Sequence, residues 1–171
     1  MRRFAVRLVL ASCVSLLFAG TTLAAKTFSK ADAEQLHAIA EQLIIAGRDI
    51  TQSLKLMPPE DRAARCLEGV HDSTISVTSS IIEVWRLLTL AASMRDPDDE
   101  RLAIAAIADA LKPTTLALSR SREEINGWMG ICSSSPVVNA KGQTVIGLFS
   151  ETVAALVPVT AKIREVLARP L

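Results

Sequence analysis

Aromatic side chains are scarce in this sequence. Its 171 residues include no tyrosine, two tryptophans and four phenylalanines. Stacking on bases or sugars needs more aromatic groups than that, so neither ligand class is expected. The charges show no excess of one sign, because 19 Lys and Arg accompany 18 Asp and Glu, for a formal net charge of +1. Binding to duplex nucleic acid needs a basic patch, and we therefore expect no nucleic-acid partner.

Motifs of known catalytic chemistry are missing as well. The sequence contains no Gly-x-Ser-x-Gly, no phosphate-binding glycine loop, and no Ser or Asp placed as a recognisable partner for either histidine. It also lacks Cys-x-x-Cys-His, which excludes covalently attached haem. We expect a protein without a cofactor that does not act as an enzyme.

The first residues have the order of a secretory signal peptide. Met1–Arg7 carries three arginines, Leu8–Ala19 carries no charge, and Thr22-Leu23-Ala24 ends in small residues. This order predicts a signal peptide over residues 1–24, followed by a single domain over residues 25–171. Removing the signal leaves 16 basic and 18 acidic residues, a net charge of −2. We expect a periplasmic or secreted protein of a bacterial envelope.

Membrane attachment is not expected from the sequence. Leu10-Ala11-Ser12-Cys13 has the form of a lipoprotein processing site, but cleavage there would leave the apolar residues 14–19 on the mature chain. Leu8–Ala19 is shorter than the roughly 20 residues of a spanning helix. The most apolar later stretch, residues 145–167, is interrupted by four charges, at Glu151, Lys162, Arg164 and Glu165. We therefore expect no transmembrane segment after the signal.

The rest of the chain has the pattern of four helices. Apolar residues recur at spacings of three and four over residues 30–56, 60–94 and 97–129, and again in a helix beginning between residues 136 and 144. Ser29 with Asp32 forms a capping-box pattern, and Asp96-Pro97 is a typical helix start. Strand signals are nearly absent and the connections are short. The pattern predicts an all-α, up-down-up-down four-helix bundle.

Two cysteines remain once Cys13 is removed with the signal. Cys66 lies early in the second predicted helix and Cys132 just after the third, so both fall at the same end of an antiparallel bundle. In an oxidising compartment this placement predicts one disulfide. A reactive thiol or a metal ligand is the alternative for these residues.

Both histidines belong to Glu-x-x-His motifs, Glu34 to His37 and Glu68 to His71. Di-iron four-helix proteins use two such motifs. Counted from the first interhelical turn, however, the two histidines differ in height by roughly 13 Å, whereas paired metal ions lie ~3.5–4 Å apart. We expect surface glutamates and boundary histidines, with a metal- or haem-binding bundle as an alternative.

Polar residues and prolines gather near the middle of the predicted bundle. Residues 73–80 read Ser-Thr-Ile-Ser-Val-Thr-Ser-Ser, and two prolines fall inside the third and fourth helices. One interpretation is a polar waist that holds a small ligand. Its candidate ligand-binding residues are Thr74, Thr78, Pro113, Thr114 and Pro158. The other interpretation is that the hydroxyls bond to their own helix backbone.

These observations favour an exported protein that acts non-enzymatically, by interaction with another protein or with a second copy of itself. An inhibitor or immunity protein, a chaperone-like factor and an assembly subunit all fit this description. The second helix is apolar around more of its circumference than one seam requires. The candidate partner surface is Ile45, Ile75, Ile82, Leu87 and Leu90. A small-ligand carrier and a metal- or haem-binding bundle are the alternatives.

Overall fold

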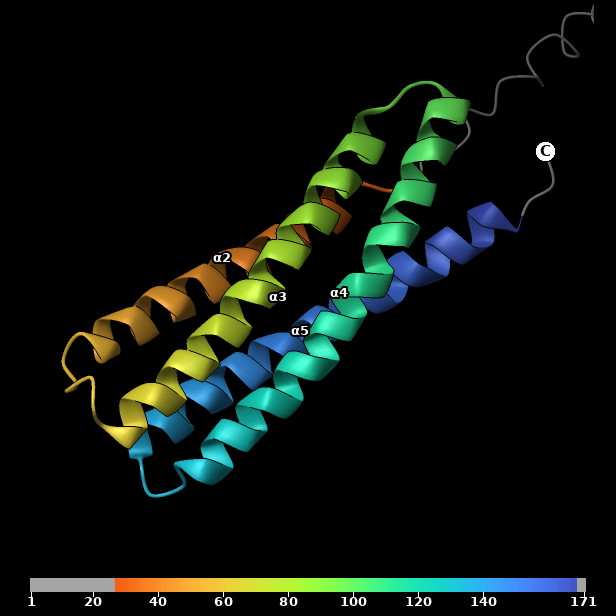
Figure 1. The fold of residues 1–171 in the computed structure, drawn as a ribbon. Helices are drawn as coiled ribbons and strands as arrows, with labels where there is room; N and C mark the ends of the chain where they lie inside the picture. The colour runs from red at the N-terminus through yellow and green to blue at the C-terminus, as the bar shows by residue number, and fades with distance from the viewer. Residues whose placement is uncertain (1–26, 169–171) are drawn as a thin grey trace, which may run out of the picture.

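The computed structural model describes residues 27–168, and it contains four helices and no strand within that range (Figure 1). The helices are α2 (Lys30–Leu54), α3 (Arg62–Ser93), α4 (Pro97–Ile131) and α5 (Pro136–Leu167). Each runs antiparallel to the helix before it. The predicted up-down-up-down four-helix bundle is confirmed. The predicted signal peptide lies outside the described residues.

Each helix begins at a capping residue that accepts a hydrogen bond from a backbone N–H in the first turn. Ser29 and Asp32 form the predicted capping box of α2, and Asp96 caps α4 ahead of Pro97. Asp61 caps α3, and Ser135 caps α5. The fourth helix therefore begins at the earliest position that the sequence left open.

The helices are ordered α2, α3, α4, α5 around the bundle, and α3 also contacts α5 across it, whereas α2 and α4 do not meet. Because α3 has three neighbours, more of its circumference must be apolar than one seam would require. The core is a single cluster of apolar side chains, most of them aliphatic, to which all four helices contribute. Its largest fully buried members are Phe28, Phe149, Leu36, Leu43, Ile50, Leu67 and Ile81.

The predicted disulfide is present. Cys66, in the second turn of α3, is bonded to Cys132, the C-cap of α4, with their Cα atoms 6.5 Å apart. Both residues are buried. The bond ties together two helices at the end of the bundle opposite to the start of α2.

One sequence-based prediction is wrong. By length and composition, α3, α4 and α5 are each long and apolar enough to cross a membrane, with mean hydropathies of 1.3, 1.3 and 1.6 over their most apolar 18-residue windows. The expectation of no transmembrane segment counts Glu151, Lys162, Arg164 and Glu165 as interruptions of the last helix. Lys162, Arg164 and Glu165 lie near its end, and an apolar window of 18 residues can contain up to two charges such as Glu151.

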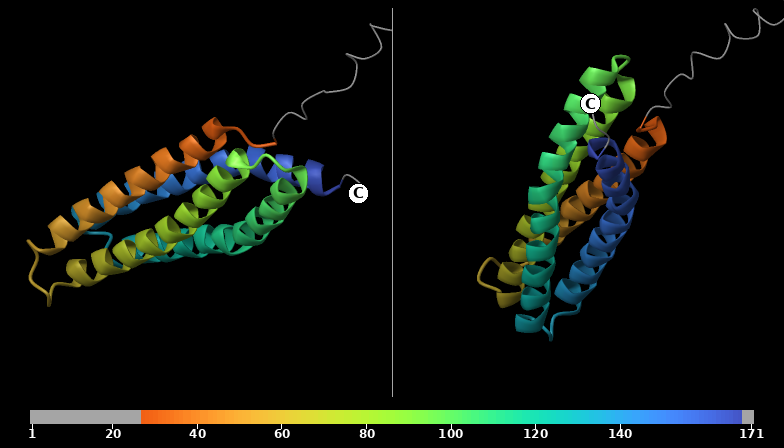
Figure 2. Two further views of the ribbon diagram at one scale, coloured as in Figure 1. Left: turned by 90° about the horizontal axis from the view of Figure 1, so that it is seen from above. Right: turned by 90° about the vertical axis from the view of Figure 1, so that its right-hand side faces the viewer.

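The bundle is not uniform along its length. α4 is bent in its middle part (Figure 2), where Pro113 interrupts the backbone hydrogen bonds of the helix. The second half of α5 diverges from the first half of α4 and lies beside the start of α2 instead (Figures 1 and 2). The seam between α4 and α5 is open toward this end of the bundle, where residues of both helices line a hollow.

Candidate functional site

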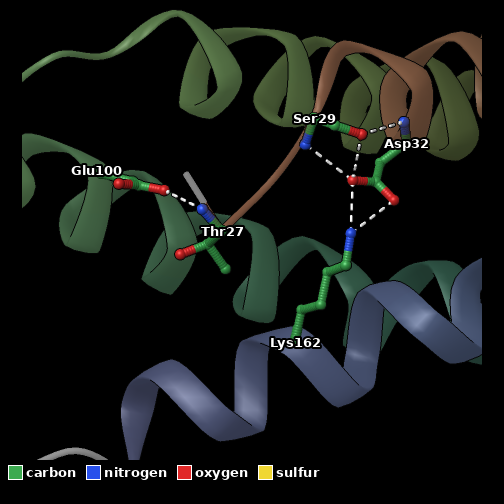
Figure 3. Close-up of polar contacts among 5 residues, drawn as sticks. All are labelled: Thr27, Ser29, Asp32, Glu100 and Lys162. Carbon is green, nitrogen blue, oxygen red and sulfur yellow. Dashed lines mark hydrogen bonds and ion pairs between the residues drawn. The ribbon is translucent and has the colours of Figure 1, made fainter. Parts of the chain in front are cut away.

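A short segment before α2 holds the open end of the bundle together. Phe28 is fully buried, and the backbone N–H of Thr27 donates to Oε1 of Glu100 in α4 at 2.9 Å. Next to it, Nζ of Lys162 in α5 donates to both carboxylate oxygens of Asp32, at 2.6 and 2.8 Å (Figure 3). The segment before α2 thus contacts α4, and the first turn of α2 contacts α5. We call this group of five residues, Thr27, Phe28, Asp32, Glu100 and Lys162, the N-terminal clasp.

The hydrogen bonds of the N-terminal clasp favour the ionised form of Asp32. Partial burial raises the pKa of Asp32, but the hydrogen bonds from Lys162 and Ser29 outweigh it, so the pKa lies below its ordinary value. The Lys162 ammonium also lies 5.8 Å from the centre of the Phe28 ring, a cation–π distance. These contacts hold the second half of α5 against the start of α2.

The open seam forms a continuous groove between α4 and α5. It consists of two adjoining hollows of about 360 and 700 Å³ that share Thr115, Thr160 and Arg164. The complete lining is Ala108, Leu111, Lys112, Thr115, Leu118, Val153, Leu156, Val157, Thr160, Ala161, Ile163, Arg164 and Leu167. We call this feature the α4–α5 groove.

The surface of the α4–α5 groove is mainly aliphatic. Its floor consists of buried core residues, Leu111, Leu118, Leu156 and Ile163. Its rim carries large apolar side chains in contact with water: Val153 is 49% exposed, Val157 63% and Leu167 41%. The only charged residues in the lining are two cations, Lys112 on the α4 wall and Arg164 on the α5 wall. The groove is thus built to contact an apolar surface with negative charge at its edges.

A second, more polar groove of about 730 Å³ lies between α3 and α4. The Ser73 hydroxyl, which is buried, donates to Oε2 of Glu124 at 3.0 Å. Trp128 lies against Gly69, where a side chain would overlap the indole ring. Arg120, Ser121 and Pro113 line the same groove. It can offer hydroxyl, carboxylate and guanidinium groups to a polar ligand.

The predicted waist residues do not form one site. The hydroxyls of Thr74, Thr78 and Thr114 are buried, and each donates to the backbone carbonyl four residues earlier at 2.7–2.8 Å. Thr74 and Thr78 line a shallow groove between α2 and α3, whereas Pro113 lines the groove between α3 and α4. Since α5 starts at residue 136, Pro158 lies roughly 12 Å further along the bundle than a start at 144 would place it.

The two Glu-x-x-His motifs are also apart. His37 packs against Trp85 with ring centroids 4.4 Å apart, whereas Nε2 of His71 lies 3.0 Å from the Thr51 hydroxyl. Glu34 is exposed and paired with Lys30, and Glu68 is exposed. Within residues 27–168, no three His, Cys, Asp or Glu side chains are grouped as metal ligands.

The candidate partner surface is spread over two helices. Ile45 on α2 is 62% exposed, and Ile75 and Leu90 on α3 are also exposed. Ile82 and Leu87 are partly buried and pack against the core. Ile75 lines the groove between α2 and α3, whereas Val153, Val157 and Leu167, which lie outside the predicted surface, line the α4–α5 groove.

The sequence does contain a signal for the α4–α5 groove. Val153 and Val157 lie one turn apart on the fourth helix, off the stripe of core residues, and Arg164 follows two turns later. Only the divergence of α5 from α4 shows that they border a groove.

The chain was compared with protein-family models, with curated protein sequences and with solved structures, and no match was found in any of the three.

Proposed function

We propose that this chain is an exported protein of the bacterial envelope that acts non-enzymatically by binding another protein, and that the α4–α5 groove is the binding surface. The observation that carries the proposal is the exposed aliphatic rim of that groove, with Val153 and Val157 in contact with water. Exposed apolar side chains lining a continuous groove are typical of interaction sites. The signal-peptide pattern and the disulfide support the assignment to an oxidising compartment.

Native mass spectrometry tests this proposal. The chain is produced from its full sequence and isolated, together with its partner, from the envelope of its source cells. We expect a mature chain that begins at Ala25, lacks the two hydrogens lost on disulfide formation, and carries an added protein mass. A chain of full uncleaved mass in the cytoplasm would contradict the export. An added iron or haem mass would contradict the function and favour the metal- or haem-binding alternative.

Two variants with matched exposure test whether binding occurs at the groove. Val157→Asp places a charge on the rim, whereas Ile45→Asp places it on α2, and the two side chains are 63% and 62% exposed. We expect the added protein mass to disappear with Val157→Asp and to persist with Ile45→Asp. The reverse result would contradict the groove and favour the surface around Ile45.

The second candidate function is a carrier of a small polar ligand. It is supported by the groove between α3 and α4, where Pro113 lies together with Ser73, Glu124 and Arg120. An organic mass in the same native spectrum that disappears with Arg120→Ala would favour the carrier. Retention of that mass by the variant would exclude this groove as its site.

A further inference from the structure

We propose that the occupant of the α4–α5 groove is an amphipathic helix of a partner protein, with acidic residues on both sides of its apolar stripe. This inference rests on the proposed function and specifies its partner. The groove offers an aliphatic floor and a cation on each wall, Lys112 on α4 and Arg164 on α5. An apolar stripe bordered by carboxylates complements both features.

The length of the groove suits a short helix. Along α5 it extends from Val153 to Leu167, roughly 21 Å at 1.5 Å per residue, and along α4 from Ala108 to Leu118, roughly 15 Å. A helix of about 10–14 residues covers that distance. Anchors at i, i+3, i+4 and i+7 of such a helix would contact the floor residues Leu111, Leu118, Leu156 and Ile163.

The charges of the groove argue against occupants from this chain itself. In a symmetric dimer through this groove, the Lys112 and Arg164 side chains of one copy would face those of the other. Residues 1–26 contain four basic and no acidic residues, Arg2, Arg3, Arg7 and Lys26. Both arrangements bring like charges together, whereas an acidic helix brings opposite charges together.

The rim favours a helix over a free acyl chain. Val153, Val157 and Leu167 keep 41–63% of their surface in contact with water, so the groove does not enclose its occupant. An acyl chain is apolar all round and would leave one side in water. An amphipathic helix buries one face and keeps its polar face in solvent.

Each of the two cations also has a favourable interaction within its own helix, so the test needs a control. Arg164 lies in the last turn of α5, where any cation is favourable to the helix dipole. Lys112 lies in the middle of α4 and is 3.2 Å from Asp109, which it pairs with in solvent. Both side chains are therefore substituted together. The resulting loss of peptide binding is compared with the effect of substituting a cation elsewhere on α4.

Titration of the mature, disulfide-closed chain with synthetic helical peptides tests the inference. One peptide of about 14 residues carries leucines at the anchor positions and glutamates beside them, and its twin carries lysines in place of the glutamates. We expect the acidic peptide to bind about tenfold more tightly than the basic one. The double variant Lys112→Glu with Arg164→Glu is expected to reverse this preference. Arg122→Glu, an exposed residue of α4 outside the groove, is expected to leave it unchanged.

Each of the following results would overturn the inference. Equal binding of both peptides, or binding unaffected by Val157→Asp, would show that the groove does not select an acidic helix. Binding of palmitate at the groove without binding of either peptide would identify a lipid site instead. If neither peptide binds while Val157→Asp still removes the native protein mass, the inference fails and the proposed function stands. If that mass is also absent from the wild-type chain, both fail.

Discussion

Among single residues, Asp32 connects two helices through one carboxylate. It completes the capping box of α2 with Ser29 and accepts two hydrogen bonds from Lys162 of α5. Its side chain is mostly buried, so the pair is less screened than a surface salt bridge. One carboxylate therefore caps a helix and also joins it to the last helix of the bundle.

Asp32→Asn is expected to destabilise the protein by about 1 kcal/mol at neutral pH, because it removes the charge that pairs with Lys162 and leaves one acceptor oxygen in place of two. The pKa of Asp32 is lowered in the folded state, so its contribution is complete well above the ordinary value of 3.8. It is lost as the pH falls below that value, through the lowered folded pKa. Urea unfolding of wild type and variant at pH 7 and pH 3 measures this. The exposed Glu34→Gln is the control, and a pH-independent difference would contradict the assignment.

Gly69 provides a second test at the residue scale. An alanine Cβ at this position would overlap the Trp128 ring, whereas at Gly47 it would meet no atom within 4 Å. We expect Gly69→Ala to destabilise the protein by about 1–3 kcal/mol through overpacking. Gly47→Ala is expected to stabilise it by up to about 1 kcal/mol, through helix propensity. Thermal unfolding of both variants gives the comparison. Equal shifts of the unfolding midpoint would show that the indole ring of Trp128 moves aside without loss of stability.

At the scale of helices, the disulfide is the strongest link that does not depend on packing. It joins α3 to the end of α4 across a sequence separation of 66 residues. Closing a loop of this size constrains the unfolded chain by about 4 kcal/mol in the chain-entropy model. We expect the double variant Cys66→Ala with Cys132→Ala to lose about that much stability in urea unfolding. A variant as stable as the wild type, with free thiols in the exported wild type, would contradict a structural bond.

The helices themselves could be predicted because their signals are local. The capping residues Ser29 and Asp96 precede helices that begin where the sequence places them. The sequence leaves the start of the last helix open between residues 136 and 144, since its first turns contain Asn139 and Gly142, which are weak helix formers. In the structure Gly142 lies against Met129 of α4. That reason for a glycine comes from tertiary packing and is invisible to a local pattern.

The candidate site could not be predicted in the same way. Val153 and Val157 are apolar and lie outside the core stripe, but a pattern cannot show whether the neighbouring helix covers them. The course of the second half of α5 involves contacts between distant parts of the chain, such as that of Lys162 with Asp32, 130 residues earlier. The groove is thus a product of the tertiary structure.

At the scale of the whole molecule, three of the four helices are apolar enough to cross a membrane, by length and composition alone. In the bundle the same helices share a continuous core and are linked by a disulfide between α3 and α4. Their exposed apolar side chains include the rim of the α4–α5 groove. The central claim is that this groove is where another protein binds.

Site-specific photo-crosslinking in the source cells tests that claim most directly. A photoreactive amino acid is placed in turn at Val157 in the groove, at Ile45 on α2, and at Leu102 on α4 outside the groove, all of them exposed. We expect one discrete protein adduct from Val157 and none from the other two. Adducts from Ile45 without any from Val157, or adducts only with lipid, would contradict it.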